Sequence, residues 1–239
     1  MIKIKGVGCC LYLLSWAVKS LQIECRLQFL RLLFFDTSTP GTDGYQTVRL
    51  MYEYLKQYYP VSDELCEALL TCCEQKEFSK KELLISAGSA CNNLYFISEG
   101  FCICYFEKDG REHVVRFFKE GDFCTSFHGF LGHKKSFLCV RASEKTTVLC
   151  VSRRNFEYLW KSFDDFACLI YAILEKHAIE YEEKYFRMRS LSPAERIRYY
   201  IENHEIQMLL KRVPQYLIAS YLQMTAEHYA KLQSQLNKR

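Results

Sequence analysis

The spacing of hydrophobic and polar positions changes several times along the chain, and each change predicts a different kind of element. Behind Ser62, apolar residues recur at helical spacing and predict a short helix that ends near residue 73. Between residues 78 and 152, short apolar or aromatic runs alternate with turn signals. Asp109-Gly110, between two such runs, is a strong hairpin signal. Strands are expected at 82–85, 93–98, 101–106, 113–118, 137–141 and 146–151, which together predict a β-sandwich, jelly roll or barrel.

Helical spacing returns after residue 152, with a short amphipathic helix expected at 153–160 and a longer one at 164–188. In the longer one, steps of four and three residues alternate along Phe166, Ile170, Ile173 and His177. This spacing is typical of a two-stranded coiled coil, in which the four side chains would form a dimer interface. A helix that packs the same stripe onto its own β-structure has the same pattern, so both arrangements remain open.

Two further stretches carry helix signals. Ser192, Pro193 and Glu195 are an N-cap, an N1 proline and an N3 glutamate, which predict a helix to about residue 203. Residues 213–236 then read as two short helices joined by a tight turn, with Thr225 as the N-cap of the second. Such a pair suits a helix-turn-helix, whose second helix enters the DNA major groove, although an ordinary helical hairpin has the same pattern.

Composition narrows the class of protein. Of the 239 residues, 49% are apolar, which is enough for a core and excludes wholesale disorder. The net charge of +4 is modest, but from Arg187 onward nine basic residues stand against four acidic ones. A basic C-terminal segment would be attracted to phosphate, with a merely solvated surface as the alternative.

Cysteine and histidine usage argues against metal sites and catalysis. The thirteen cysteines include no C-x-x-C, and many lie in apolar runs, where free thiols act as small hydrophobes. We therefore expect a reducing, cytoplasmic location and no metal. An enzyme on a cupin-like barrel would need His-x-His, which is absent, and His113, His128 and His133 lie apart without a nucleophile or paired carboxylates.

Residues 1–50 do not match the rest of the chain. Lys3 and Lys5 precede a short apolar run that looks like the start of a signal peptide but is too short to span a bilayer. A second apolar patch and a Thr/Gly/Pro linker follow. Three interpretations remain open: a targeting or membrane-surface segment, an added amphipathic helix, or a non-native or disordered extension, with natural translation beginning at Met51.

Three motifs in this order resemble the Crp/Fnr family of bacterial transcription regulators. They are LYFISEGFCICYFEKDGREHVVRFFKEGDF, LSPAERIRYYIE and VPQYLIASYLQMTAEHYAKL, and the last is similar to short members from Bacteroidetes-like bacteria. The resemblance covers roughly residues 51–238. It implies an α+β fold with a cyclic-nucleotide-binding-like β-roll (a double-stranded β-helix) as sensor domain at 51–162. A long dimerisation helix at 163–190 and a winged-type helix-turn-helix domain at 191–239, in a shortened form, would follow.

The family's β-roll holds cyclic nucleotide with a Gly-Glu pair for the ribose and an Arg-Ser pair for the phosphate. Here Thr125-Ser126 and Ser136-Phe137 fall at those places, and Lys135 offers charge without a bidentate fork. We therefore expect a pocket formed by Thr125, Ser126, Lys135 and Ser136 that does not bind cyclic AMP. No cofactor is expected, and neither an iron–sulfur cluster nor haem is favoured by the cysteine and histidine spacing.

The resemblance also assigns DNA contacts. In the second short helix, Glu227 can accept from cytosine, while His228 and Lys231 can reach guanine or phosphate, with Thr225 at the N-cap. Gln215 and Tyr216 open the first helix as candidate phosphate contacts. Gln223 replaces the usual turn glycine, so we expect either a different turn or strain at positive φ. Alternatively, Glu227 and Lys231 are a surface i,i+4 pair.

The sequence thus predicts a non-enzymatic, homodimeric regulator that binds double-stranded DNA in the cytoplasm. An unknown small-molecule effector and RNA polymerase are the further partners that the resemblance implies. The alternative function is a ligand sensor or scaffold whose helix-turn-helix has decayed and does not bind DNA.

Overall fold

The computed structural model describes residues 51–203 and 205–236, and the predictions for residues 1–50 lie outside that part of the chain. The fold is α+β, with a β-roll followed by helices, as predicted. Two antiparallel four-stranded sheets form the roll, in the orders β1-β8-β3-β6 and β2-β7-β4-β5. The strands are β1 (Cys73–Phe78), β2 (Leu83–Ile85), β3 (Asn93–Glu99), β4 (Cys102–Lys108), β5 (Arg111–Phe118), β6 (Phe123–Cys124), β7 (Cys139–Ala142) and β8 (Thr146–Ser152).

The β4–β5 hairpin forms at the predicted turn. Asp109 and Gly110 have φ values of 53° and 70°, the two positive angles of a type I′ turn, and Lys108 pairs with Arg111 across it. In the sheet order, β5 is an edge strand, so one side of its backbone has no partner among the strands that the structure describes. What covers this edge determines where the C-terminal helices lie.

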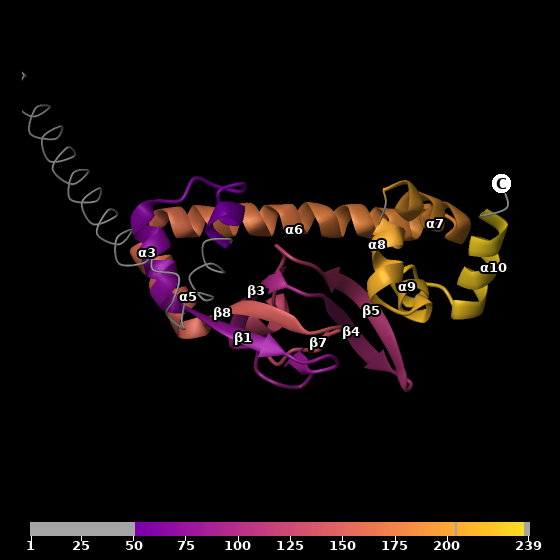
Figure 1. Ribbon diagram of the computed structural model, residues 1–239, viewed down its shortest axis with the longest axis horizontal. Helices are drawn as coiled ribbons and strands as arrows, with labels where there is room; N and C mark the ends of the chain where they lie inside the picture. Colours follow the sequence, from indigo (N-terminus) through magenta and orange to yellow (C-terminus); the bar gives the residue numbers. More distant parts are fainter. Residues whose placement is uncertain (1–50, 204, 237–239) are drawn as a thin grey trace, which may run out of the picture. The chain divides into compact units, whose positions relative to one another are not determined.

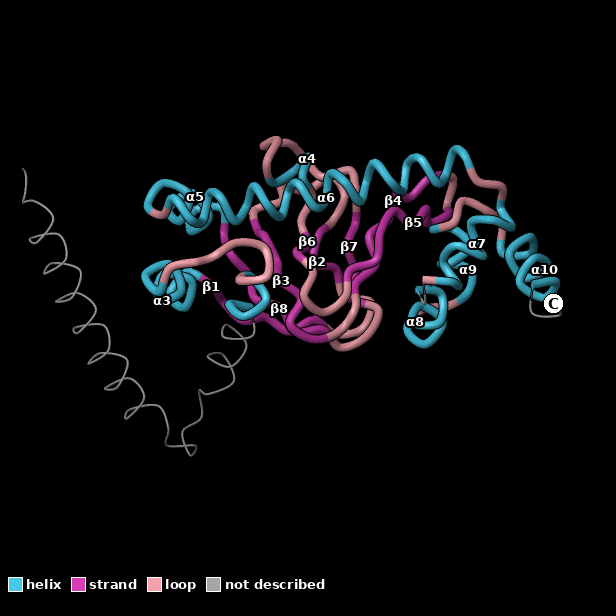
Figure 2. The backbone as a smooth tube through the Cα atoms, turned by 90° about the horizontal axis from the view of Figure 1, so that it is seen from above, coloured by secondary structure: helices cyan, strands magenta, loops and turns pink. Residues whose placement is uncertain are grey.

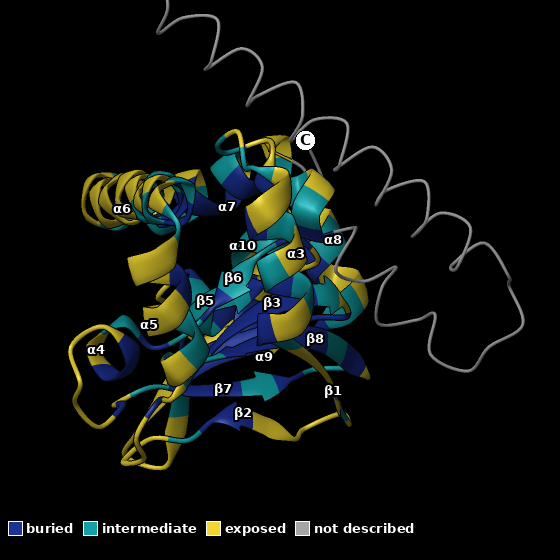
Figure 3. Ribbon diagram, turned by 90° about the vertical axis from the view of Figure 1, so that its left-hand side faces the viewer, coloured by how far each residue is buried: buried dark blue, intermediate teal, exposed yellow. Residues whose placement is uncertain are grey.

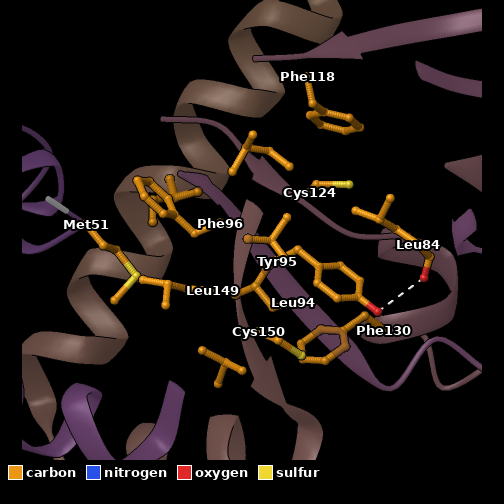
Figure 4. Packing of buried hydrophobic residues seen from close by; sticks show 14 of the residues in the cluster. Met51, Leu84, Leu94, Tyr95, Phe96, Phe118, Cys124, Phe130, Leu149 and Cys150 are labelled. Carbon is orange, nitrogen blue, oxygen red and sulfur yellow. Dashed lines mark hydrogen bonds between the residues drawn. The ribbon is translucent and has the colours of Figure 1, made fainter. Parts of the chain in front are cut away.

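The core of the roll lies between the two sheets (Figure 4). Phe96, Cys124 and Leu149 are at most 4% exposed there. The buried Tyr95 hydroxyl donates to the Leu84 carbonyl at 3.2 Å, so this polar atom is satisfied within the core. Burial raises the pKa of the Cys104 thiol to about 12, as expected for a structural rather than a reactive thiol.

Helices flank and follow the roll (Figures 1 and 2). They are α3 (Asp63–Cys72), α4 (Phe127–Phe130), α5 (Arg153–Ser162), α6 (Asp164–Ser190), α7 (Pro193–Glu202), α8 (Glu205–Arg212), α9 (Gln215–Tyr221) and α10 (Ala226–Leu236). Capping residues next to the helices determine where two of them begin. The Ser62 hydroxyl caps α3, and Ser192 and Glu195 form a capping box at the start of α7. None of these helices combines the length and apolar character that crossing a membrane requires.

The long helix α6 packs one face on the roll and leaves the other exposed (Figure 3). The predicted seam of Phe166, Ile170, Ile173 and His177 is at most 6% exposed in the single chain. The three apolar members belong to the core of the roll, while His177 lies beside Phe127 and Arg116. The assignment of this stripe to a dimer seam is therefore corrected, because the roll of the same chain already covers it.

The helices α7–α10 form a C-terminal module with a second hydrophobic cluster. Its buried centre includes Tyr200 and Tyr229. The cluster continues into the outer face of the β4–β5–β7 sheet through Phe101, Ile103 and Val114, so the module packs on the roll. From Asp164 to Leu236, the regular elements among the described residues are helices, and the predicted wing stays a prediction.

Candidate nucleic-acid interface

The turn between α9 and α10 is a Schellman motif built on Gln223. The Met224 N–H donates to the Ala219 carbonyl and the Gln223 N–H to the Ser220 carbonyl, both at 3.0 Å. Gln223 has φ 57°, the left-handed conformation that its position requires. Of the two outcomes expected for Gln223, the structure has the positive φ, so a glutamine holds the backbone angle at which glycine is usual. The helix-turn-helix itself stays a prediction.

The predicted base-contacting residues lie together on the outer side of α10. Thr225 caps the helix by accepting the His228 N–H at 3.2 Å. Thr225, Glu227, His228 and Lys231 are exposed, whereas Tyr229 on the inner side is fully buried. The buried face fixes α10 to the module and directs its polar face toward solvent, which is the arrangement that groove recognition requires.

The carboxylate of Glu227 turns back onto its own helix. It accepts from its own backbone N–H and from the Thr225 side chain, and these hydrogen bonds lower its pKa. Glu227 and Lys231 form no ion pair in the described part of the chain. The ammonium of Lys231 and the His228 ring are consequently the groups of α10 that remain open to an anion.

The other two predicted contacts belong to a different helix. Gln215 and Tyr216 begin α9 and are exposed, Tyr216 by 54%. Tyr216 lies within electrostatic range of Arg141 on β7, so this end of α9 is next to the roll. The structure thus brings four of the six predicted residues together and leaves Gln215 and Tyr216 apart from them.

The opposite face of α9 covers the edge of β5. The Ser220 hydroxyl accepts the Val114 N–H at 2.9 Å and donates to the Glu112 carbonyl at 3.0 Å. The Phe117 and Tyr221 rings pack with their centroids 5.0 Å apart. One hydroxyl thus satisfies two backbone groups that a neighbouring strand would otherwise pair.

Ion pairs strengthen the same contact. Arg212, at the end of α8, donates to Glu120 at 2.8 Å and also binds Glu144, both on the roll. The Arg212 hydrogen bond is the main cause of the lowered pKa of the Glu120 carboxyl. Sequence reasoning missed Ser220 and Arg212 as docking residues, because their partners lie between 68 and 108 residues away and no local signal links them.

The predicted ligand residues of the roll are engaged by the fold itself. The Thr125 hydroxyl donates to the Asn93 carbonyl, the Ser126 hydroxyl caps α4, and the Ser136 hydroxyl donates to the Leu138 carbonyl. Lys135 is exposed. The guanidinium of Arg153 is used by main-chain carbonyls, among them that of Cys91 at 2.8 Å.

The space beside these residues is small and apolar. A cavity of about 30 Å³ lies between the roll and α6, lined by Thr125, His177 and otherwise apolar side chains. This volume corresponds to about two water molecules. Within residues 51–203 and 205–236, no cluster of three or more His, Cys, Asp or Glu side chains is arranged to hold a metal ion.

Comparison with known proteins agrees with this architecture. Residues 75–163 match the family model of the cyclic nucleotide-binding domain. A comparison of the sequence with curated proteins gave no match. Among solved structures, FixK2 from Bradyrhizobium japonicum is similar with a TM-score of 0.59 and 19% identity, over 70% of this chain and 85% of that one.

Two more structures extend over both the roll and the helices. The c-di-GMP-responsive global regulator CLP from Xanthomonas campestris has a TM-score of 0.61 and 18% identity, covering 74% of this chain and 92% of CLP. A CooA mutant from Carboxydothermus hydrogenoformans has a TM-score of 0.56 and 18% identity, covering 74% and 79%. All three are Crp/Fnr-type regulators, and at these identities the likeness concerns the fold. Residues 75–163 thus resemble a cyclic nucleotide-binding domain within a chain that shares the fold of these regulators.

Proposed function

We propose that this chain is a non-enzymatic transcription regulator of Crp/Fnr type that binds double-stranded DNA through α10. The observation that carries the proposal is the exposed face of α10, where the His228 and Lys231 side chains point away from the buried Tyr229 and lie near the capped N-terminus of the helix. A cationic side chain on an exposed recognition helix can contact phosphate or guanine. The shared fold of the solved regulators supports the same assignment.

The test is selection of bound fragments from the source genome, followed by mobility shifts at several salt concentrations. Lys231→Ala should weaken binding about tenfold and flatten the salt dependence by about one ion. Lys161→Ala is a matched control, because Lys161 is an equally exposed lysine on α5. Binding that is insensitive to salt, or unchanged in Lys231→Ala, would contradict the assignment of α10.

We propose a homodimer that uses the outer face of α6 rather than the stripe buried on the roll. Large apolar side chains recur there at multiples of seven residues, since Tyr171 and Tyr185 are fourteen positions apart and Ile179 and Phe186 are seven. These four side chains are between 52% and 67% exposed. A repeat of this length is what a helix pair uses as its seam. Ile179→Glu should shift the mass measured by light scattering from dimer to monomer, whereas a monomeric wild type would contradict the proposal.

We further propose that the regulator does not respond to cyclic AMP. The hydroxyls of Thr125, Ser126 and Ser136 are occupied by the fold, and the small apolar cavity beside them offers no arginine fork. Calorimetric titration with cyclic AMP should give no binding heat at millimolar nucleotide. Contact with RNA polymerase follows from the family resemblance alone and is testable by co-purification on promoter DNA.

The alternative function is a ligand sensor or scaffold without DNA binding. Two observations favour it. The Glu227 carboxylate accepts hydrogen bonds from its own helix rather than being available to a base, and α9 is held against β5. In that case genomic selection would enrich no sequence, while the oligomeric state and fold would remain intact.

A further inference from the structure

A second, larger cavity lies where β5, α6 and the C-terminal module meet; we call it the junction cavity. Its volume is about 370 Å³, within the about 300–1,000 Å³ that small-molecule sites occupy. The roll contributes Arg116 and Phe117, α6 contributes Lys184 and Arg187, and α7 and α9 contribute Tyr199 and Tyr221. It is separate from the small apolar cavity between the roll and the first half of α6.

Two cations of α6, one turn apart, have hydrogen-bond donors to spare in this cavity. The ammonium of Lys184 donates to the Val115 carbonyl and stands 3.6 Å from the centre of the Tyr221 ring. With three N–H groups, it has two left over. Arg187 donates to Glu183 at 3.2 Å through Nη1, while its Nε is buried and has no hydrogen-bond partner among the described residues. A buried donor without an acceptor is unfavourable, so a ligand group that accepts from the Arg187 Nε would be stabilised in this cavity.

The acids of the junction cavity do not supply that acceptor. Glu180 forms an ion pair with Arg116 at 2.7 Å, and Glu183 forms one with Arg187. Asp122 accepts a hydrogen bond from the Lys119 backbone N–H at 2.9 Å. Glu205 also lines the cavity, but it forms no ion pair with a described residue, and burial raises its pKa, which favours the neutral carboxyl over a negative charge. Lys184 therefore has no carboxylate partner within the part of the chain that the structure describes, and burial lowers its pKa to about 7.

The remaining walls are aromatic. Phe117 and Tyr221 pack against each other at one side, and Tyr199 lies under the Arg187 guanidinium at 4.7 Å. Ring faces of this kind accept flat, unsaturated groups, while the two cations accept one anionic group. An inorganic anion alone would leave the aromatic walls uncovered.

We propose that the junction cavity binds a small organic anion in which one carboxylate or phosphate is attached to an aromatic ring. The anionic group accepts from Lys184 and Arg187, and the ring lies against Phe117 and Tyr199. Such a ligand touches the roll, α6 and the C-terminal module at once, so it binds the docked arrangement better than any arrangement in which the module has moved. Binding of the anion to the junction cavity does not depend on the proposed DNA contact. Only the idea that this binding regulates the protein rests on the proposed function.

The test is calorimetric titration of the full chain with phenyl phosphate, benzoate and inorganic phosphate. We expect at least one ring-bearing anion to bind at least tenfold more tightly than inorganic phosphate, and the two head groups to show whether phosphate or carboxylate is preferred. Lys184→Met and Arg187→Gln should each weaken that binding at least tenfold. Lys161→Met, on α5, is the control and should bind like the wild type.

A second readout keeps the proposal testable if a variant folds poorly. In the wild-type chain, acetic anhydride labels accessible neutral amines, and mass spectrometry reports the labelling of each lysine. The ring-bearing anion should protect Lys184 several-fold and leave Lys161 unchanged. The proposal is overturned if no ring-bearing anion binds at millimolar concentration, if inorganic phosphate binds equally well, or if bound anion leaves Lys184 unprotected. None of these measurements contains DNA, so their outcome is independent of the test of α10.

Discussion

Replacing Arg212 with alanine removes the ion pairs that join α8 to the roll. Arg212 binds both Glu120 and Glu144, and its guanidinium also lies 4.8 Å from the centre of the Phe101 ring. A hydrogen bond to a charged group contributes about 1.5–3 kcal/mol, but the two carboxylate side chains are 42% and 36% exposed. Solvent screening reduces the total to about 1–2 kcal/mol.

This loss should appear as local opening of the docked face rather than as global unfolding. The amide of Val114 reports on it, because that N–H donates to Ser220 across the contact. A loss of about 1–2 kcal/mol raises the population of the open form about 5–30-fold, and hydrogen exchange of the Val114 amide should accelerate by the same factor. Lys145→Ala is the control, since it removes a more exposed ion pair with Glu77 on the roll.

Acid should have the same effect as the Arg212 substitution. Because the folded-state pKa of Glu120 is lowered, its contribution is fully present above the ordinary glutamate pKa and is lost as pH falls through the lowered value. In the wild type, opening at Val114 should therefore increase as the solution is acidified below about pH 4, and Arg212→Ala should remove most of this dependence. An unchanged exchange rate of the Val114 amide in Arg212→Ala would refute the inference that these ion pairs hold the module.

Three further predictions concern single side chains. Tyr229→Phe removes a fully buried hydroxyl that has no hydrogen-bond partner in residues 51–203 and 205–236, so the urea midpoint should rise by the equivalent of about 1 kcal/mol; a clear loss of stability would reveal a partner for that hydroxyl. Gln223→Gly relieves a left-handed residue at φ 57° and should also stabilise by about 1 kcal/mol in urea unfolding, unless glutamine makes a compensating contact. The folded-state pKa of Lys184 is about 7, so the unfolded chain binds more protons above that pH, and the stability of the wild type relative to that of Lys184→Met should rise by about 1.6 kcal/mol from pH 7 to 8.5; parallel pH profiles would exclude this shift.

The elements that the sequence predicted correctly depend on interactions between residues close together in the chain. The Asp109-Gly110 turn and the Ser192 capping box each depend on neighbours no more than three positions away, and both formed as expected. Strand β1 was missed because its burial alternates weakly along a polar segment, and β6 because it is two residues long. Such short or polar strands owe their existence to the partner strand, which no local pattern reveals.

The sequence could not show which surface each helix packs against, because the packing partner lies far away along the chain. The buried stripe of α6 fits a coiled-coil seam and a roll-packed face equally well, and the roll, which is built from a different part of the chain, decides between them. The basic residues of the tail were counted as a charge excess, yet Arg212 is neutralised by Glu120 and Glu144, while Lys231 is exposed and forms no ion pair with a described residue. Formal charge counts locate a basic segment but cannot tell a docking residue from a DNA contact.

The way α6 and α9 are held determines which motion can carry a signal. Because its inner stripe is buried in the core, α6 cannot rotate on the roll without exposing Ile170 and Ile173, at about 1.5–3 kcal/mol for each side chain. Movement of α9 instead breaks the Ser220 contacts to an edge strand, where water can replace both hydrogen bonds at a small net cost. Displacement of the C-terminal module about the α6–α7 connection would also break the Arg212 ion pairs and expose Phe101 and Ile103, so it needs a ligand or partner that changes this balance. An anion in the junction cavity that binds the docked arrangement only tenfold better would shift that balance by about 1.4 kcal/mol, comparable to the Arg212 ion pairs. The charges at this junction, rather than the interior of the roll, are then the natural place for a small molecule to control the orientation of α10.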